Sequence, residues 1–209
     1  ENGVGICAGF YLAGGKPLML IQSTGLGNMI NALESLNVTC KIPLPILTSW
    51  RGVYKEAIEA QVPLGVRLPA ILEGAGFAYT IIDEAEKLSL IEDVILDSFE
   101  NSRPHIALIS PKVWEASDCC AWKEAGMPEK PEVMEKTCRF SLTRETLRPV
   151  MLRNDAICAV ASELDEEITV TNLGVPCKEL YACKDRALNF YMFGSMGLVS
   201  SIGMGIALR

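Results

Sequence analysis

Four short apolar runs, separated by turns and by helix-like stretches, constrain the fold of this chain more than any other feature. The runs are PLMLIQ (17–22), IPLPILTSW (42–50), FAYTII (77–82) and HIALIS (105–110). The stretches around them predict helices at 4–13, 29–36, 68–75 and 84–100. Buried strands that alternate with helices are typical of a parallel sheet covered by helices on both faces. We therefore predict an α/β fold.

The alternation stops between residues 112 and 143, where the sequence is mixed, aperiodic and interrupted by proline, and we interpret this segment as a linker. Beyond it the alternation resumes. The predicted elements are a helix across 144–163, a strand at 167–172, a helix near 178–183, a strand at 189–193 and a last helix from 197. The sequence therefore predicts two units, 1–111 and 144–209, each with a parallel sheet flanked by helices, the second of them truncated.

Composition argues against several classes of function. The net charge of −7 argues against nucleic-acid binding, although a local field can still attract a small anionic substrate. The most hydrophobic stretch, 187–208, is broken by glycines and serines around Met196, and we interpret it as a strand plus a helix and not as a membrane span. The eight cysteines include no C-x-x-C pair, so zinc is not expected, and we interpret them as small, reduced core residues of a cytoplasmic protein. The single histidine, His105, is interpreted as structural, which leaves a Ser-His or Cys-His pair without a base.

Two glycines follow the first predicted strand in STGLGN (23–28), which is interpreted as a turn before a helix. Glycines let backbone N–H groups approach a ligand closely, and the N-terminus of a helix favours an anion. The signal alone is weak, because a tight turn without a ligand has a similar composition and the full G-x-G-x-x-G fingerprint is missing. No acidic residue stands about 20 positions further on to hold a ribose, which argues against a dinucleotide.

Several motifs together carry a resemblance to a known superfamily. The stretch ENGVGICAGFYLAGGKP (1–17), followed by STGLGN, resembles the pyrimidine-binding domain of thiamine diphosphate enzymes. TNLGVPCKELY (171–181) and GSMG (194–197) resemble the opening of the diphosphate-binding domain of the same superfamily. The resemblance implies a pyrimidine-binding domain at 1–111 with its N-terminal part missing, a linker at 112–143, and the start of a diphosphate-binding domain at 144–209.

At family level, QSTGLGN, SWRG, NLGVPCKELY and DRALNFYMFGSMG resemble the sulfopyruvate decarboxylases of methanogenic archaea. Those enzymes often have two separate subunits, one for each cofactor-binding domain, so the chain resembles a fused form. Phosphonopyruvate decarboxylase shares the architecture and several motifs and is the nearest alternative.

The resemblance implies roles for particular residues. Glu1 falls on the catalytic glutamate that hydrogen-bonds N1′ of the cofactor's aminopyrimidine, and Met196 falls on the bulky apolar residue that holds the cofactor in a bent shape. An ordinary core position is the alternative for Met196. Cys177 stands where related proteins carry Ser or Thr, and a thiol is a weaker donor to a diphosphate. The implied cofactor-binding residues are Ser23, Thr24, Gly25, Gly27, Asn28, Gly174, Gly194, Ser195, Met196 and Gly197.

The magnesium motif of the superfamily, a Gly-Asp-Gly followed by an asparagine, does not occur in this chain. The ligands that would let Mg²⁺ hold the diphosphate are therefore expected beyond Arg209. We expect the chain to be a fragment that is inactive alone.

The implied activity is decarboxylation of 3-sulfopyruvate to sulfoacetaldehyde and CO2, in coenzyme M biosynthesis, by a homo-oligomer with its active site between subunits. A sulfonate needs a cation, and Arg51, directly after a predicted strand, is the first candidate, ahead of Lys55, Lys184 and Arg186. A surface ion pair or a helix cap is the alternative for Arg51. Phosphonopyruvate as the substrate, and a non-catalytic partner or regulatory fragment, are the alternative functions.

Overall fold

The computed structural model describes residues 1–115 and 150–209, and each of these parts contains a parallel sheet. In the first sheet the strand order is β1-β2-β4-β3, and all neighbours are parallel. Its strands are β1 (Met19–Gln22), β2 (Leu44–Ser49), β3 (Ala78–Ile82) and β4 (Pro104–Ile109). The second sheet pairs β5 (Thr169–Thr171) with β6 (Asn189–Tyr191). The predicted α/β fold with parallel sheets is confirmed, and every predicted strand overlaps an observed one.

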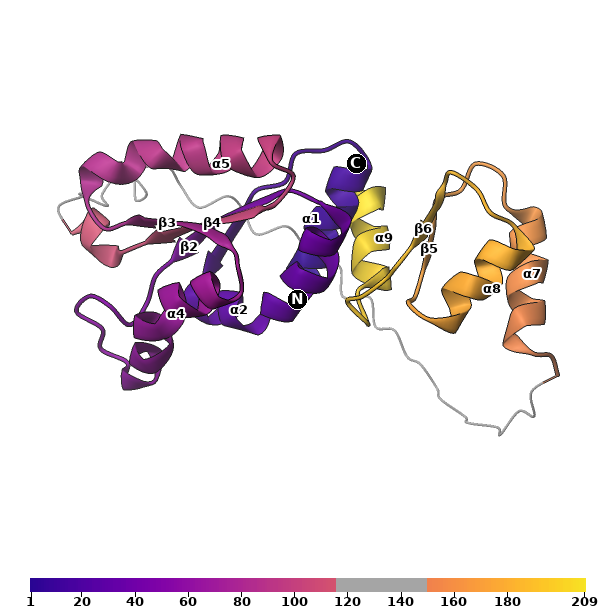
Figure 1. The fold of residues 1–209 in the computed structure, drawn as a ribbon, viewed down its shortest axis with the longest axis horizontal. Helices are drawn as coiled ribbons and strands as arrows, with labels where there is room; N and C mark the ends of the chain where they lie inside the picture. The colour runs from indigo at the N-terminus through magenta and orange to yellow at the C-terminus, as the bar shows by residue number, and fades with distance from the viewer. Residues whose placement is uncertain (116–149) are drawn as a thin grey trace, which may run out of the picture.

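Helices flank both sheets (Figure 1). α5 (Leu90–Glu100) covers one face of the first sheet, and α2 (Ser23–Asn28) and α4 (Val62–Gly74) lie on the other. The second sheet lies between α9 (Val199–Ala207) and the pair formed by α7 (Arg153–Glu163) and α8 (Val175–Cys183). The remaining elements are α1 (Asn2–Leu12), α3 (Ile30–Ala32), the π-helix η1 (Leu33–Val38), and the 3-10 turns η2 (Glu59–Gln61), η3 (Ala85–Ser89) and η4 (Pro111–Trp114). Within the described ranges, no helix is long and apolar enough to cross a membrane.

Several predicted boundaries differ from the structure. STGLGN is a helix, α2, and not a turn, because buried Leu26 anchors it to the core and packing outweighs the low helix propensity of its glycines. α4 begins at Val62, six residues before the predicted helix, with a proline in its first turn. The predicted helix at 84–100 divides into η3 and α5, and the one at 29–36 into α3 and η1.

The linker predicted at 112–143 and the start of the helix predicted at 144–163 fall largely outside the described residues. The first residues of the predicted linker belong to η4, and the helix predicted at 144–163 is observed as α7, which begins at Arg153. The division into domains at 111 and 144 therefore stays a prediction.

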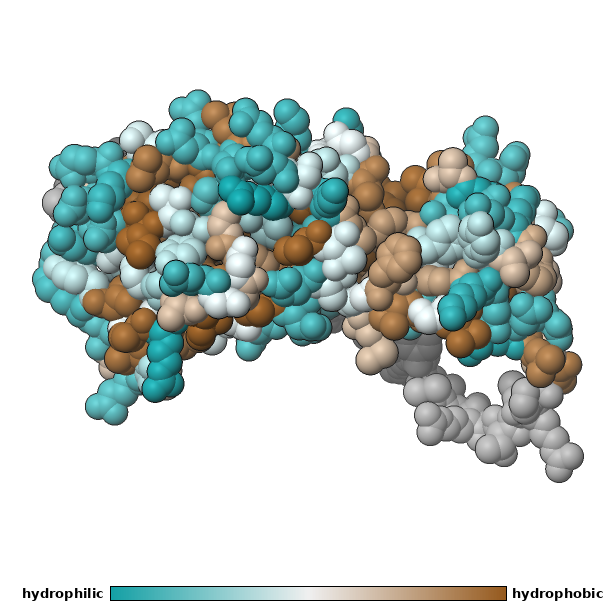
Figure 2. Space-filling model, viewed as in Figure 1, coloured by the Kyte–Doolittle hydropathy of each residue, from teal (hydrophilic) through white to brown (hydrophobic). Residues whose placement is uncertain are grey.

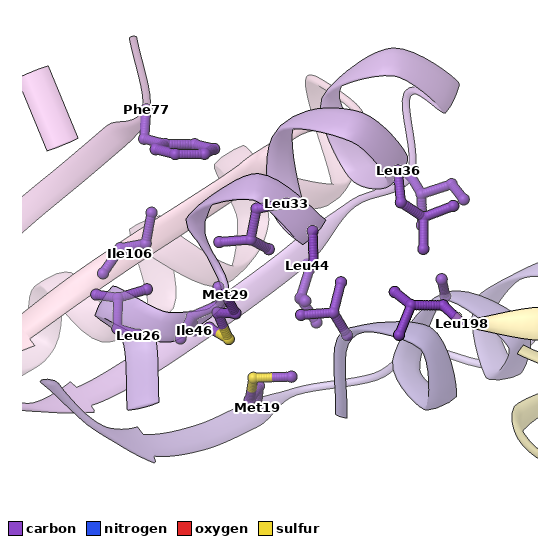
Figure 3. Packing of buried hydrophobic residues seen from close by; sticks show 14 of the residues in the cluster. Met19, Leu26, Met29, Leu33, Leu36, Leu44, Ile46, Phe77, Ile106 and Leu198 are labelled. Atoms are coloured by element: carbon purple, nitrogen blue, oxygen red, sulfur yellow. The ribbon is translucent and has the colours of Figure 1, made fainter. Parts of the chain in front are cut away.

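One continuous hydrophobic core joins elements of both parts of the chain (Figure 3). It is built around leucine, isoleucine and methionine side chains of η1, β1, β2 and α4, and Leu36 and Leu198 lie at the same end of it. Leu198 and Ile202, at the start of α9, are buried in this cluster together with Val4 and Ala8 of α1. The two sheets are separate, but α9 belongs to the packing of the first sheet as well as the second.

Glycines let α1 and α9 pack in close contact. A Cβ atom added to Gly9 would lie 2.0 Å from the carbonyl oxygen of Ile202, and one added to Gly205 would lie 2.0 Å from the carbonyl oxygen of Ile6. Cβ atoms do not approach other atoms this closely, so the backbones of both helices would have to move apart. Gly9 and Gly205 are therefore required at this crossing.

Gly205→Ala is expected to lower the free energy of unfolding by about 1–3 kcal/mol, the usual cost of forcing an extra group into a packed core. Gly203→Ala, two residues away on the same helix, is the matched control. An added Cβ at Gly203 has no heavy atom within 4 Å, so this variant is expected to be neutral or up to about 1 kcal/mol more stable, because alanine favours the helix. Urea unfolding of both variants measures the difference. Equal effects would contradict the close helix contact.

The prediction that the cysteines are reduced is wrong for one pair. Cys158 of α7 and Cys183 of α8 form a disulfide, with their Cα atoms 5.3 Å apart and a sequence separation of 25. The sequence spacing gave no sign of this pair, because it depends on α7 packing against α8. Cys7, Cys40 and Cys177 are free thiols, and burial raises the pKa of Cys7 and of Cys40. The other three cysteines lie outside the described residues.

Candidate cofactor site

The carboxyl ends of β1 and β2 lie side by side, with Gln22 in register with Ser49. Ser23, which follows β1, is 1% exposed, and its Oγ accepts a hydrogen bond of 3.1 Å from the backbone N–H of Arg51. Thr24 Oγ1 donates to Gln61 Oε1 at 2.6 Å. Both hydroxyls therefore tie α2 to the segment after β2, and their predicted contacts with a cofactor would compete with these bonds.

The glycines of α2 also face the protein. A Cβ added to Gly27 would meet Leu64 of α4 at 3.2 Å, and one added to Gly25 would meet Ile21 at 2.7 Å. Asn28, the last residue of α2, is exposed.

Arg51 forms a two-pronged ion pair with Glu56. Its Nε and Nη2 donate to the two carboxylate oxygens at 2.7 and 2.5 Å. Glu56 also accepts from the backbone N–H groups of Gly52 and Ile58 at 3.0 and 3.1 Å, and only 5% of its side chain is exposed. The hydrogen bond from Arg51, followed by these backbone bonds, lowers the pKa of Glu56 to about 2. The ion pair that the sequence left open for Arg51 is present, so an anionic substrate would have to share this guanidinium with Glu56.

The other three candidate cations also have protein partners. Lys55 pairs with Glu115, Lys184 Nζ donates to the carbonyl oxygen of Leu164 at 2.6 Å, and Arg186 donates to backbone carbonyls of residues 165 and 167. Lys184 and Arg186 precede β6, at the amino end of the second sheet. They therefore lie away from the loop that follows β6.

The Arg51–Glu56 pair makes a pH-dependent contribution to stability. Because the pKa of Glu56 is lower in the folded chain, its contribution is present above the ordinary value of about 4.5 and is lost as the pH falls towards 2. The difference in free energy of unfolding between the wild type and Glu56→Gln is expected to be largest above pH 4.5 and to shrink below it. Urea unfolding at several pH values measures this difference. A constant difference from pH 6 to pH 2.5 would contradict the contribution of the pair.

The loop after β6 presents Met196 to solvent. Met192 is buried, whereas Phe193 and Met196 are each 80% exposed. Ser195 and Gly197 on either side of Met196 have positive φ angles of 57° and 95°, which turn the methionine out of the core. The alternative that Met196 is an ordinary core residue is wrong. A large apolar side chain held out on a tight loop is suited to support a ligand.

Glu1 lies beside the start of α9. It is the exposed N-cap residue of α1, and its backbone oxygen accepts from Val4 at 2.9 Å. Next to it, Asn2 Oδ1 accepts a hydrogen bond of 3.3 Å from Ser201 Oγ in the first turn of α9. α1 and α9 run side by side in the same direction, and Figure 1 shows the N-terminus next to the loop that leads into α9. The helix that carries Glu1 and the loop that carries Met196 are therefore brought to one place.

Gly174 and Cys177 stand at the same edge of the second sheet as this loop. Gly174 is the N-cap of α8 with φ +89°, and Thr171 at the end of β5 is in register with Tyr191. Cys177 Sγ donates to the carbonyl oxygen of Asn172 at 2.8 Å and lies 2.8 Å from Thr171 Oγ1. The thiol is thus turned towards β5, and an anion at this helix end would rely on backbone N–H groups.

The residues present fit part of a thiamine diphosphate molecule. An exposed carboxylate on α1, an exposed methionine on the adjoining loop and a glycine-opened N-terminus of α8 are the groups that an aminopyrimidine, a bent cofactor and a diphosphate need. Apolar surface gathers around α9 and β6 between the two lobes of the molecule (Figure 2). In the described part of the chain, no cluster of three or more His, Cys, Asp or Glu residues could hold a metal ion.

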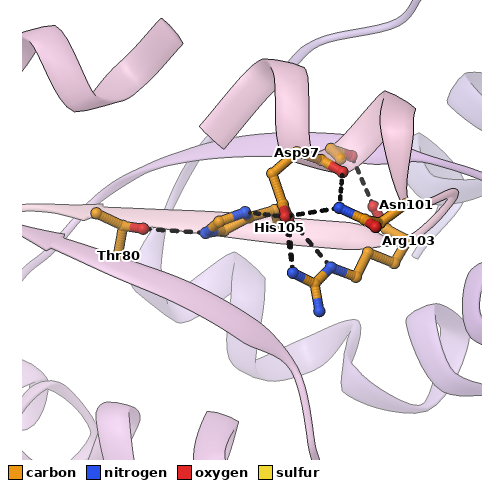
Figure 4. A network of polar contacts seen from close by, with 6 residues as sticks. Thr80, Asp97, Asn101, Arg103 and His105 are labelled. Atoms are coloured by element: carbon orange, nitrogen blue, oxygen red, sulfur yellow. Dashed lines mark hydrogen bonds and ion pairs between the residues drawn. The ribbon is translucent and has the colours of Figure 1, made fainter. Parts of the chain in front are cut away.

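His105 lies near the amino end of β4, which is an inner strand of the first sheet. Figure 4 shows its side chain. Its Nδ1 lies 2.6 Å from Asp97 Oδ2 and its Nε2 lies 3.0 Å from Thr80 Oγ1. Hydrogen bonds from Arg103, and then from His105, lower the pKa of Asp97. This network connects α5 to the sheet and lies away from the carboxyl ends of β1 and β2, in agreement with a structural role.

Sequence reasoning missed the residues that hold this site together. Ser35 of η1 contacts Ser195, Asn2 contacts Ser201, and Gln61 contacts Thr24. These partners are 37 to 199 residues apart, and a hydroxyl or amide in a helix gives no local sign of such a contact.

Comparison with known proteins adds to this geometry. No protein-family model matches the chain. It is 42% identical over 118 residues to the sulfopyruvate decarboxylase subunit alpha of Methanococcus maripaludis, covering 55% of this chain and 70% of that protein. The chain belongs to the sulfopyruvate decarboxylase family. A sulfopyruvate decarboxylase of Methanosarcina acetivorans is 84% identical over all 209 residues, which are 54% of that protein. This family member therefore spans about half the length of that curated relative.

The family also includes proteins named as beta subunits. The sulfopyruvate decarboxylase subunit beta of Methanocaldococcus jannaschii is 58% identical over 58 residues, covering 27% of this chain and 31% of that protein. This sulfopyruvate decarboxylase family chain thus matches both an alpha and a beta subunit, as the predicted fused form requires. Phosphonopyruvate decarboxylases match at lower identity.

Proposed function

We propose that this chain is part of a thiamine diphosphate-dependent decarboxylase that converts 3-sulfopyruvate into sulfoacetaldehyde and CO2, a step of coenzyme M biosynthesis. The observation that carries the proposal is the placement of Met196, exposed on a strained loop next to α1, the helix whose N-cap is Glu1. Family membership supports the substrate, and the greater distance of the phosphonopyruvate decarboxylases favours sulfonate over phosphonate.

Loss of CO2 from a 2-keto acid leaves a carbanion that side chains cannot stabilise, and bound thiamine diphosphate supplies the electron sink. Glu1 would hydrogen-bond the aminopyrimidine and hold a proton at N1′. Met196 would fill the bend between the two rings, which is a matter of shape and not of charge. The backbone at Gly174 and the first turn of α8 would face the diphosphate.

Arg51 is proposed to hold the sulfonate, with its charge shared between the substrate and Glu56. Nε and Nη2 are used by Glu56, and Nη1 has no hydrogen-bond partner among the described residues. A sulfonate that binds at Nη1 would keep the ion pair intact. Mg²⁺ ligands, a homo-oligomeric assembly and a site between subunits remain proposals.

The test is CO2 release by the whole protein from 3-sulfopyruvate and from phosphonopyruvate, with thiamine diphosphate and Mg²⁺ present or omitted. We expect cofactor-dependent release, with a higher kcat/KM for 3-sulfopyruvate. A higher kcat/KM for phosphonopyruvate would identify phosphonopyruvate as the preferred substrate. No release from either acid would favour a non-catalytic partner or regulatory protein.

A further inference from the structure

The hydroxyl of Ser195 points away from the proposed cofactor position and into the first part of the chain. Ser195 is 6% exposed, and its Oγ lies 2.6 Å from Ser35 Oγ and 3.3 Å from the carbonyl oxygen of Ala32. Its φ of 57° is unusual for a residue with a side chain, so the loop needs an interaction to hold it there. These contacts are made to η1 and to α3 next to it, far from Ser195 in sequence.

Each of these two hydroxyls has one proton and one backbone acceptor of its own. Ser35 Oγ can donate to the carbonyl oxygen of Asn31 at 2.7 Å, and Ser195 Oγ can donate to the carbonyl oxygen of Ala32 at 3.3 Å. Either hydroxyl can donate in the 2.6 Å contact between them. In both arrangements the short bond joins the loop to η1.

Gly194 shows that the loop also fits closely against Ser35. A Cβ added to Gly194 would lie 2.7 Å from Ser35 Cβ and 2.8 Å from the Ser35 carbonyl oxygen. A glycine is therefore required here. Ser35 belongs to a π-helix, a rare and costly helical form that is often found at functional sites.

We propose that Ser35 is a positioning residue for Met196: it binds the hydroxyl of Ser195 and so holds the loop at the angle that presents the methionine. The consequence for catalysis rests on the proposed function, whereas the contact itself does not. Ser195 is thereby assigned to holding the loop, and not to direct binding of the cofactor as the sequence predicted.

Disulfide trapping tests the contact without any cofactor. The double variant Ser35→Cys/Ser195→Cys replaces two oxygens 2.6 Å apart with sulfurs, which bond at about 2.05 Å. Mild oxidation should cross-link it, as detected by mass spectrometry of proteolytic peptides. The two single cysteine variants are the controls for exchange with the native cysteines. A double variant with both new thiols accessible to alkylation and no cross-link would overturn the contact.

Removing the hydroxyls tests the positioning role. Ser35→Ala and Ser195→Ala should each lower Tm by about 2–4 °C, and the double variant by clearly less than the sum of the two, because both single variants lose the shared bond. In the whole protein each should reduce kcat by about tenfold or more while the Kd for thiamine diphosphate stays within twofold. Additive Tm shifts would overturn the shared bond, and an unchanged kcat would overturn the positioning role.

Two further variants separate positioning from general stability. Ser98→Ala removes another buried serine hydroxyl, one that donates to the Arg103 carbonyl oxygen at 2.6 Å, and should lower Tm without changing kcat. Ser195→Gly relieves the positive φ but lacks the hydroxyl, so kcat should fall as it does in Ser195→Ala. Wild-type kcat in Ser195→Gly would show that backbone conformation alone sets the loop. If the cross-link forms but the wild-type protein decarboxylates neither acid, the contact stands and the proposed function fails.

Discussion

The Glu1→Gln variant of the whole protein is expected to bind thiamine diphosphate normally and to lose about 10²- to 10⁴-fold in turnover. Gln has the same size as Glu, so the start of α1 and its contact with α9 should be preserved. The amide cannot share a proton with N1′ of the aminopyrimidine, which is the role proposed for Glu1. The exposure of Glu1 at the N-cap leaves its carboxylate free to take this role.

The measurements are kcat with 3-sulfopyruvate and the Kd for thiamine diphosphate by calorimetry. Glu92→Gln, an exposed glutamate on α5, is the matched control and should leave both values unchanged. A kcat for Glu1→Gln within threefold of the wild type would remove Glu1 from the catalytic role. A loss of cofactor binding together with turnover would make it a binding residue.

Met196→Ala is expected to slow turnover by about 10²-fold with little effect on folding. Displacing a reacting group by about 1 Å slows a reaction by about this factor. Since Met196 is 80% exposed, its truncation should change the free energy of unfolding by less than about 0.5 kcal/mol. The same truncation of a buried core methionine would instead lower the free energy of unfolding by about 2–5 kcal/mol. Met196→Leu keeps the volume and should retain most of the activity.

Hydrogen–deuterium exchange at C2 of bound thiamine diphosphate isolates the step that the bend serves. We expect slow exchange in Met196→Ala, near-normal exchange in Met196→Leu, and normal exchange in Met204→Ala, an exposed methionine further along α9. Normal exchange in Met196→Ala would refute the supporting role and leave this residue as an exposed loop position.

Local pattern was enough to predict most of the fold. The four apolar runs of the first sheet overlap β1 to β4. The inner strands β2 and β4 are buried along most of their length, and a strand buried on both faces must be apolar throughout. Prediction from the local sequence was wrong where tertiary packing outweighed helix propensity. STGLGN contains two poor helix formers, yet Leu26 and the close approach of Gly27 to Leu64 make it a helix.

The candidate site divides in the same way. The resemblance singled out Glu1 and Met196, and the structure brings the helix of one beside the loop of the other. The resemblance also singled out Gly174 and Gly197, and both adopt positive φ angles, which glycine tolerates best. The partners could not: Glu56 binds Arg51, Cys158 binds Cys183, and neither pair follows from spacing.

The amino-acid sequence by itself determined the parallel α/β architecture and the identity of the groups offered at the site, because periodicity reports which faces are buried and motifs report which side chains follow each strand. Only the tertiary structure decided which groups meet. The close packing of α1 on α9 and the hydrogen bond between Ser195 and Ser35 join residues that lie more than 150 positions apart. Such contacts depend on the summed packing of the whole core, and no single stretch of the chain encodes them.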